Sequence, residues 1–410
     1  SPLLISIFAA GFIDQPAKFD LTADMLRLTF PYILLISMTA MAGGILNTWK
    51  RFAVPAFTPV LLNLSLIGCA MWLSPRLDVP ITGLAWGVLL AGILQLLFQL
   101  PFLYRAQLLP RPKWGWRHEG VQKIIKLMIP ALFGSSVAQI NLLFDTFIAS
   151  FLVTGSVSWL YYSDRLLEFP LGVFGIALAT VVLPNLSAAH YKEGDDSFNQ
   201  TLTWAVQLSL IIAVPATFGL FILAQPILAT LFEYGAFQAN DSMMAAYSLM
   251  AYSLGLPAFI MIKILANGFY ARQDTRTPVR IGIQAMVLNM ALNVVLVVSM
   301  LQANFLAPHV GLALATSAAA YFNAFRLARE LRRDAILGPL ETFSKPLLKI
   351  LFACIAMGLL IHFLLPELES WSEWRWYQRL AQLAWMILPA ILCYGLVLWI
   401  MGFRRKHLVA

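Results

Sequence analysis

Residues 380–401 read LAQLAWMILPAILCYGLVLWIM, a stretch without a single Asp, Glu, Lys or Arg. An α-helix rises about 1.5 Å per residue, so about 20 apolar residues cross the hydrocarbon core of a bilayer. A strand of a membrane β-barrel is about half as long and alternates apolar with polar residues, which this stretch does not do. The stretch therefore predicts a membrane-spanning α-helix.

Similar apolar stretches recur along the chain. Of its 410 residues, 60% are hydrophobic and 12% are charged, and the mean hydropathy is +0.77. A soluble domain carries about 25% charged residues, so lipid has to be the solvent for most of this chain. Further spans are predicted at 26–46, 54–73, 81–104, 124–153, 157–188, 203–224, 242–269, 279–301, 308–328 and 344–364. The apolar stretch at 1–13 is too short to cross, so we expect the natural N-terminus to be missing.

Basic residues are distributed unevenly among the loops between these spans. Taken alternately, one set of loops holds most of the 28 Lys and Arg residues, and the other holds only Lys18, Arg27, Arg76, Arg375 and Arg379. Short cytoplasmic loops of membrane proteins are enriched in Lys and Arg. The basic set is therefore predicted to be cytoplasmic, with the C-terminus inside. The net charge of +8 thus reflects membrane orientation and does not indicate nucleic-acid binding.

A weak internal repeat suggests two lobes. Regions 31–63 and 257–289 each place a proline-containing span before a Gly, a basic loop, a Pro that opens the next span, and an Asn. Repeats of the same orientation are typical of transporters with two lobes related by an axis along the membrane normal. Pro and Gly also mark helix ends in unrelated proteins, so the pattern alone leaves both interpretations open.

A charged cluster lies within the predicted span 157–188. Asp164 and Glu168 are four residues apart and share a helix face, and Arg165 is three residues before Glu168 and can pair with it. Ionisable residues within a span are expensive, and they usually face a cavity or a partner. One interpretation is a self-neutralised cluster near the outer membrane surface. The other is an anion site, in which the Arg165 guanidinium offers its fork of N–H donors to a phosphate.

Further polar residues lie within other predicted spans. Asp145 has no basic residue nearby in its own span, so it needs a proton, a cation or a partner from another helix. Asn289, Asn293 and Thr316 supply oxygen atoms of the kind that a hard monovalent cation such as sodium prefers. The alternative is hydrogen bonding between helices by Asn and Thr. Lys263 either snorkels to the cytoplasmic interface or adds positive charge to the inner half of a cavity.

The sequence contains no enzyme signature. It has no Ser-His-Asp candidate set, no HExxH motif and no phosphate-binding Gly-rich loop, and its three Cys residues match no metal spacing. We therefore expect no cofactor except a coupling cation. A membrane glycosyltransferase or acyltransferase would need a catalytic carboxylate or His in an ordered outer loop. The longer outer loops, 14–25 and 365–379, show no such set.

Four motifs resemble those of the MurJ (MviN) lipid II flippase family. They are SVSWLYYSDRLLEFP at 156–170, FPYILL at 30–35, GILNTW at 44–49 and GFYARQD at 268–274. The resemblance extends over essentially the whole chain. It implies an all-α bundle of the multidrug/oligosaccharidyl-lipid/polysaccharide exporter superfamily, with two pseudo-symmetric six-span lobes and two extra C-terminal helices. The corresponding parts are 1–110 (an N-terminal lobe without its first two spans), 111–340 (the C-terminal lobe) and 341–410 (the two additional helices).

The resemblance also implies a function. A monomer in a bacterial inner membrane would move lipid II, the undecaprenyl-pyrophosphate-linked sugar-peptide, from the cytoplasmic to the periplasmic leaflet by alternating access, for cell wall synthesis. The resemblance implies Arg165, Asp164 and Glu168 as substrate-binding residues, and Lys263 joins them as a positive charge in the inner half of the cavity. The positions that match a cation site of the family are Asp145, Asn289, Asn293 and Thr316. The alternative is a multidrug/cation antiporter or a polysaccharide-lipid exporter of the same superfamily.

Overall fold

The computed structural model describes residues 2–109, 115, 118–192, 195–339 and 341–403, and the regular elements of these residues are all helical. The chain divides into two compact units, Ser1–Pro130 and Ala131–Ala410. The boundary falls within one long helix, α6 (Glu119–Ser150). The predicted division into 1–110, 111–340 and 341–410, with its pseudo-symmetry, remains a prediction.

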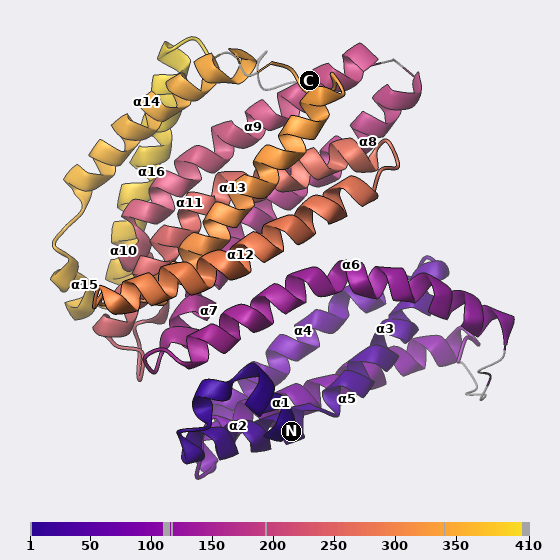
Figure 1. The fold of residues 1–410 in the computed structure, drawn as a ribbon. Helices are drawn as coiled ribbons and strands as arrows, with labels where there is room; N and C mark the ends of the chain where they lie inside the picture. Colours follow the sequence, from indigo (N-terminus) through magenta and orange to yellow (C-terminus); the bar gives the residue numbers. More distant parts are fainter. Residues whose placement is uncertain (1, 110–114, 116–117, 193–194, 340, 404–410) are drawn as a thin grey trace. The chain divides into compact units, whose positions relative to one another are not determined.

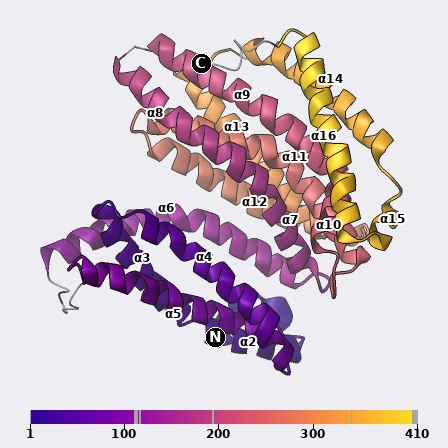
Figure 2. The same cartoon turned by 180° about the vertical axis from the view of Figure 1, so that it is seen from behind.

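In the first unit, α5 packs against α2, α3 and α4 (Figure 2). The elements are α1 (Pro2–Phe8), η1 (Ala10–Phe12), α2 (Pro16–Thr29), α3 (Tyr32–Thr48), α4 (Ala53–Gly68), η2 (Cys69–Leu73), η3 (Ser74–Arg76) and α5 (Thr82–Arg105). The first helix of the predicted span 26–46 begins earlier than predicted, at Pro16, because a proline in the first helical turn loses no hydrogen bond. Pro31 separates α2 from α3, since a proline inside a helix has no N–H to donate.

The second unit is arranged around α11 (Ala239–Tyr270), which packs against α7, α8, α9 and α13 (Figure 1). In its most apolar window 67% of the residues are buried, against 17–39% in the other apolar helices. The remaining elements up to residue 333 are α7 (Ser156–Pro170), η4 (Leu171–Ile176), α8 (Ala177–Lys192), α9 (Asp195–Ile222), α10 (Ala224–Phe232), α12 (Arg276–Gln302) and α13 (Val310–Arg333). Helix α11 is therefore the buried centre of the second unit, and the helices around it pack against it.

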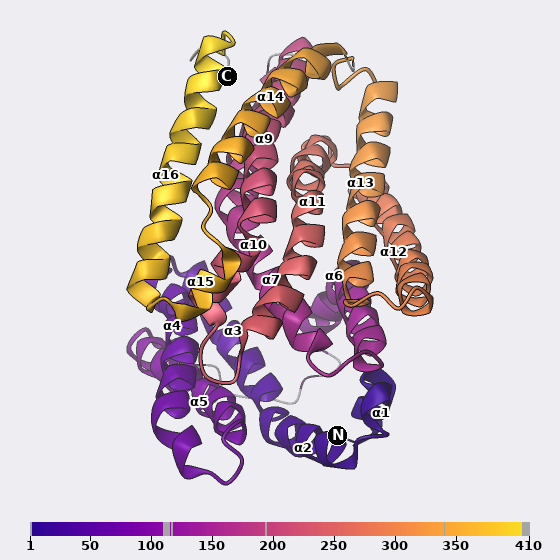
Figure 3. The same cartoon turned by 90° about the vertical axis from the view of Figure 1, so that its left-hand side faces the viewer.

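Three C-terminal helices complete the second unit: α14 (Glu341–Leu364), α15 (Leu368–Glu373) and α16 (Trp376–Ile400). Figure 3 shows α14 and α16 running beside α9. The Tyr394 hydroxyl of α16 donates a hydrogen bond to the Ile211 carbonyl of α9 at 2.7 Å. Large apolar side chains on the outer faces stay exposed, including Phe363 at 90% and Leu392 at 73%. Apolar surface of this extent requires lipid around it.

Within the described residues, nine helical segments are long and apolar enough to cross a membrane. They coincide with nine of the predicted spans, and the all-α transmembrane fold is confirmed. The predicted spans 124–153 and 308–328 coincide with α6 and α13, which are helical but are not among the nine. Helix α13 packs against both α11 and α12, so its small and polar residues face protein and need no lipid-like hydropathy.

Candidate functional site

The charged cluster predicted on α7 is assembled on one exposed face of that helix. Arg165 Nη1 lies 2.7 Å from Glu168 Oε2, and Arg165 Nη2 lies 3.8 Å from Asp164 Oδ2. The centroid of the Tyr161 ring lies 5.1 Å from the guanidinium carbon. The three charged side chains are between 39% and 52% exposed. The cluster is therefore accessible to a ligand and is not sealed within the helix bundle.

The opposite face of α7 determines how the cluster points. The buried Ser163 hydroxyl donates to the Ala245 carbonyl of α11 at 2.7 Å. The Trp159 indole N–H donates to Asp241 Oδ1, also of α11, at 2.8 Å. With this face held against α11, residues one or two positions further round the helix are turned outward. The direction of the Arg165 side chain is thus set by packing and not only by its own ion pairs.

Lys263, the fourth predicted substrate residue, lies apart from this cluster. It is half-buried on α11, and its aliphatic chain passes Gly175 of the π-helical turn η4. Among the described residues, Lys263 makes no hydrogen bond or ion pair, so its ammonium group is not committed to a protein partner.

The predicted cation ligands come together between α6, α12 and α13. The Asn293 side-chain amide donates to Asp145 Oδ1 at 2.5 Å. The Asn289 amide donates to the Thr316 hydroxyl at 3.2 Å. Asn289 and Asn293 are one turn apart on α12, and both are buried. The structure therefore supplies the interhelical partner that Asp145 requires, and it places the four residues in two hydrogen-bonded pairs, one turn apart on α12.

Three amide oxygens in this region lack a hydrogen-bond partner among the residues that the structure describes. The Oδ1 atoms of Asn141, Asn289 and Asn293 are buried and accept no hydrogen bond within the described part of the chain. An unsatisfied buried acceptor costs about 1–3 kcal/mol. A hard cation would satisfy several such oxygens at once, together with the Asp145 carboxylate. Among the described residues, no group of three or more His, Cys, Asp and Glu side chains is placed to hold a metal ion.

One feature of this region was not predicted from the sequence. Asn141, one turn before Asp145 on α6, donates to Asp145 Oδ2 at 3.5 Å, and the four-residue spacing could have revealed it.

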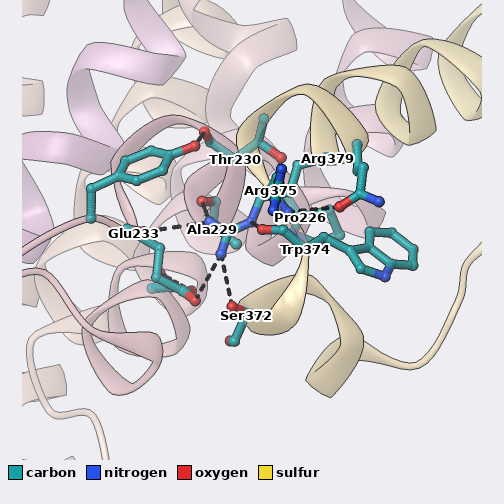
Figure 4. Close-up of polar contacts among 11 residues, drawn as sticks. Pro226, Ala229, Thr230, Glu233, Ser372, Trp374, Arg375 and Arg379 are labelled. Carbon is teal, nitrogen blue, oxygen red and sulfur yellow. Dashed lines mark hydrogen bonds and ion pairs between the residues drawn. The ribbon is translucent and has the colours of Figure 1, made fainter.

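A further buried charge lies where α16 meets α10. Arg379 is 4% exposed, although the sequence places it with the charges of an outer loop. Its guanidinium donates to the carbonyl oxygens of Ala229 at 2.5 Å, Trp374 at 3.0 Å and Ser372 at 3.2 Å (Figure 4). Because three carbonyl groups occupy its N–H donors, the guanidinium has few donors left for a ligand. We therefore interpret Arg379 as a structural residue that holds α16 to α10.

Comparison with known proteins identifies the kind of molecule that carries these sites. A sequence model of the family described as "Lipid II flippase MurJ" matches residues 1–378. The chain belongs to the MurJ lipid II flippase family. This family is one of transporters, so the predicted transporter class and the predicted family are both confirmed, and the chain is a multi-pass membrane protein.

Members of the MurJ family from several bacteria resemble the chain over its full length. The probable lipid II flippase MurJ of Haemophilus influenzae is 47% identical over 422 aligned residues, covering 100% of this chain and 81% of that protein. The corresponding Vibrio cholerae protein is also 47% identical, covering 100% of this chain and 78% of that protein. A Burkholderia cenocepacia lipid II flippase MurJ is 39% identical, covering 97% and 77%.

A solved MurJ structure shares the fold. It is described as "Lipid II flippase MurJ, inward closed conformation", and it superposes on this chain with a TM-score of 0.78 at 27% sequence identity. The superposition covers 97% of this chain and 78% of that structure. The structural comparison and the family model thus point to the same family.

Proposed function

We propose that this chain moves lipid II from the cytoplasmic to the periplasmic leaflet of a bacterial inner membrane, as a monomer that works by alternating access. Full-length similarity to proteins named as lipid II flippases supports this substrate. The single structural observation that carries the proposal is the accessible Arg165 guanidinium, oriented by the packing of α7 and paired only on its exposed face.

The ion pairs of Arg165 are weak enough to be exchanged for a ligand. Solvent-exposed ion pairs contribute about 0–1 kcal/mol, whereas a pyrophosphate can accept two parallel N–H bonds from one guanidinium. Asp164 and Glu168 orient the guanidinium before the substrate arrives. Because they recapture it afterwards, they also keep the substrate from binding too tightly to be released. Lys263 supplies a second positive charge nearer the basic loops.

Membrane orientation gives the transport a direction. The basic loops and the C-terminus are assigned to the cytoplasm, because short cytoplasmic loops are rich in Lys and Arg. An inside-negative potential then favours outward movement of the anionic head group by about 2.3 kcal/mol per charge per 100 mV. The two lobes alternate between inward and outward access, and the polyprenyl tail stays in lipid along α14 and α16.

A monovalent cation such as sodium resets the carrier. Its proposed ligands are Asp145, Asn289, Asn293 and Thr316, and two hydrogen-bonded pairs among these residues support the assignment. A bound cation neutralises the charge of the Asp145 carboxylate.

The proposal is tested by replacing Arg165 in a strain depleted of its own flippase. Arg165→Ala should abolish growth and cause lipid II to accumulate in the inner leaflet, because no other group on that face of α7 binds a pyrophosphate bidentately. The exposed Arg76 of the first unit provides a matched control, and Arg76→Ala should support growth. Protein level and thermal unfolding are measured for both variants, so that misfolding is separated from lost transport.

Substitution of a carboxylate refines the test. Glu168→Gln removes the 2.7 Å ion pair and should bind lipid II more tightly while transporting it more slowly. Normal growth and export with Arg165→Ala at normal protein level, or accumulation of a retained dye in place of lipid II, would contradict the proposal. The second result would favour a multidrug/cation antiporter.

A further inference from the structure

A cavity of about 450 Å³ lies within the second unit, between α6, α11, α12 and α13. One end reaches Asn289 and Thr316, which belong to the proposed cation site. The other reaches Tyr270, the last residue of α11, and Pro278, in the first turn of α12. Pro278 and Asn289 are about 16 Å apart along α12, at about 1.5 Å per residue. The cavity thus extends from the cation ligands to the helix ends that carry the basic loops.

Small residues on two facing helices leave this space open. Gly282 and Ala285 line it from α12, and Ala319 and Ala320 line it from α13. A Cβ atom added at Gly282 would meet no atom within 4 Å. Larger side chains at these positions would fill the space, so the small residues of α12 and α13 keep the cavity open.

The polar atoms that line the cavity are suited to a cation. The Oδ1 atoms of Asn141, Asn289 and Asn323 are buried and accept no hydrogen bond within the described part of the chain. Asn323 lies two turns from Thr316 on α13, on the side toward the basic loops. Among the described residues that line the cavity, none is charged. Unsatisfied acceptors without a fixed charge attract a cation and release it again, as carbonyl-lined pores do.

The geometry points to an access route for the coupling cation: a water-filled passage, mostly apolar but bordered by three asparagine side chains, joins the Asp145 cluster to the cytoplasmic face, and Asn323 is the intermediate oxygen ligand for sodium. The inference rests on the proposed cation site and adds the path by which that site is filled or emptied. Asn323 is uncharged and is not one of the ligands of the proposed cation site. It acts by lowering the cost of moving a partly dehydrated ion between the Asp145 cluster and bulk water.

Thiol accessibility tests the route without requiring transport. The native cysteines are first removed by Cys69→Ala, Cys354→Ala and Cys393→Ala, and growth is checked. Ala320→Cys then reports on the cavity, and Ala324→Cys is the control, because it is buried, lies one turn nearer the basic end of α13 and does not line the cavity. A membrane-impermeant maleimide added from the cytoplasmic side should label Ala320→Cys at least about tenfold faster, since a thiolate reacts only where water reaches it.

Gly282→Cys is a second reporter, because the open space beside it accommodates the side chain. If neither cysteine is labelled from the cytoplasmic side, or if Ala324→Cys is labelled as fast as both, the passage does not exist. Helix fraying would label Ala324→Cys first, so the order of reactivity separates fraying from a passage.

Sodium binding and sodium exchange are measured separately with ²²Na⁺ on the reconstituted full chain. Asn323→Leu should leave equilibrium binding near the wild-type level and slow the exchange of bound sodium, whereas Asp145→Asn should abolish binding. Wild-type exchange rates in Asn323→Leu, with binding lost in Asp145→Asn, overturn the route and leave the proposed function standing. Wild-type binding in Asp145→Asn overturns the cation site of the proposed function, and the route with it.

Discussion

Arg379, in the first turn of α16, forms a buried ion pair with Glu233, which directly follows α10: 3.6 Å separates Nη2 from Oε1. The two side chains are only 5% and 9% exposed. Glu233 Oε2 in turn accepts a hydrogen bond from the Ser242 hydroxyl of α11 at 2.8 Å. A single side chain of α16 is thereby tied to α10, and through Glu233 to the central helix of the second unit.

Loss of this ion pair should weaken the attachment of the C-terminal helices. Arg379→Ala leaves the Glu233 carboxylate buried without a counter-charge, and breaking a buried pair in this way costs about 3–5 kcal/mol. Thermal unfolding in detergent should show a large drop in stability. Arg375→Ala, one turn away and exposed, is the control and should unfold almost like the wild type. Equal unfolding temperatures for the two variants would show that the Arg379–Glu233 ion pair contributes nothing to stability.

Sodium should stabilise the wild-type chain, and Asp145→Asn should abolish that effect. A ligand that binds only the folded state stabilises it by about 2.7 kcal/mol at about 100 times its dissociation constant. The measurement is the shift in unfolding temperature between sodium chloride and choline chloride at equal ionic strength. Thr316→Ala should reduce the shift, because it removes one oxygen and the partner of Asn289. A full shift in Asp145→Asn would exclude Asp145 as a ligand.

Asp274 stabilises the loop between α11 and α12 through hydrogen bonds that its ionised carboxylate accepts. Its Oδ1 accepts hydrogen bonds from the backbone N–H groups of Arg276 at 3.0 Å and Thr277 at 3.1 Å, in the first turn of α12. Burial works to raise the pKa of Asp274, but the hydrogen bonds from Thr277 and Arg276, with the charge of Arg272, outweigh it and hold the pKa below its ordinary value.

The stabilisation by Asp274 should therefore be lost in acid. Because its pKa is lower in the folded state, the contribution is complete above the unfolded value of about 3.9 and disappears as the pH falls through the folded value. Asp274→Ala should cost about 1 kcal/mol at pH 7, as the loss of a helix cap does. The difference from the wild type in unfolding temperature should shrink below about pH 4. Asp78→Ala, at an exposed loop position, should show no such trend.

Gly155, which precedes α7, should not tolerate a side chain. Its φ is +108°, and a Cβ atom there would lie 2.6 Å from the Trp159 ring. Trp159 cannot move aside without losing its hydrogen bond to Asp241. Gly235 has a φ of +62° but no atom within 4 Å of the added Cβ, so Gly235→Ala meets only the backbone cost of about 1–2 kcal/mol.

Gly155→Ala should consequently destabilise the protein more than Gly235→Ala does. It should also reduce transport, because α7 carries the Arg165 cluster. Unfolding temperature and complementation are compared for the two variants at equal expression. The opposite order of stability would mean that Trp159 is not fixed in place.

Much of the fold was predictable because lipid imposes simple rules on a chain. A buried backbone must satisfy its own hydrogen bonds, so long apolar stretches become helices wherever they occur. The differences are equally physical. Helix α13 is absent from the nine apolar segments because the face that packs against α11 and α12 is made of small and polar residues, which lower its hydropathy. The start of α2 at Pro16 was missed because a proline in the first helical turn, and not hydropathy, marks where this helix begins.

The candidate sites divide in the same way. The contact between Arg165 and Glu168 follows from a spacing of three residues in one helix, and the sequence alone predicts it. Asp145 and Asn293 lie far apart in the chain, so the sequence predicted the group of polar residues but not which of them bonds to Asp145. The burial of Arg379 is the extreme case, because a charge at a span end normally reaches water.

The sequence by itself determined the membrane-spanning character, the helical fold, the family and the local charge cluster, because each depends on residues close together in the chain or on composition. Only the tertiary structure decided which amide oxygens stay unsatisfied, which helices enclose the cavity beside Asn289, and that Arg379 holds α16 to α10. These outcomes depend on side chains from different helices meeting at ångström distances. Packing fixes such distances, and local sequence spacing carries no information about them.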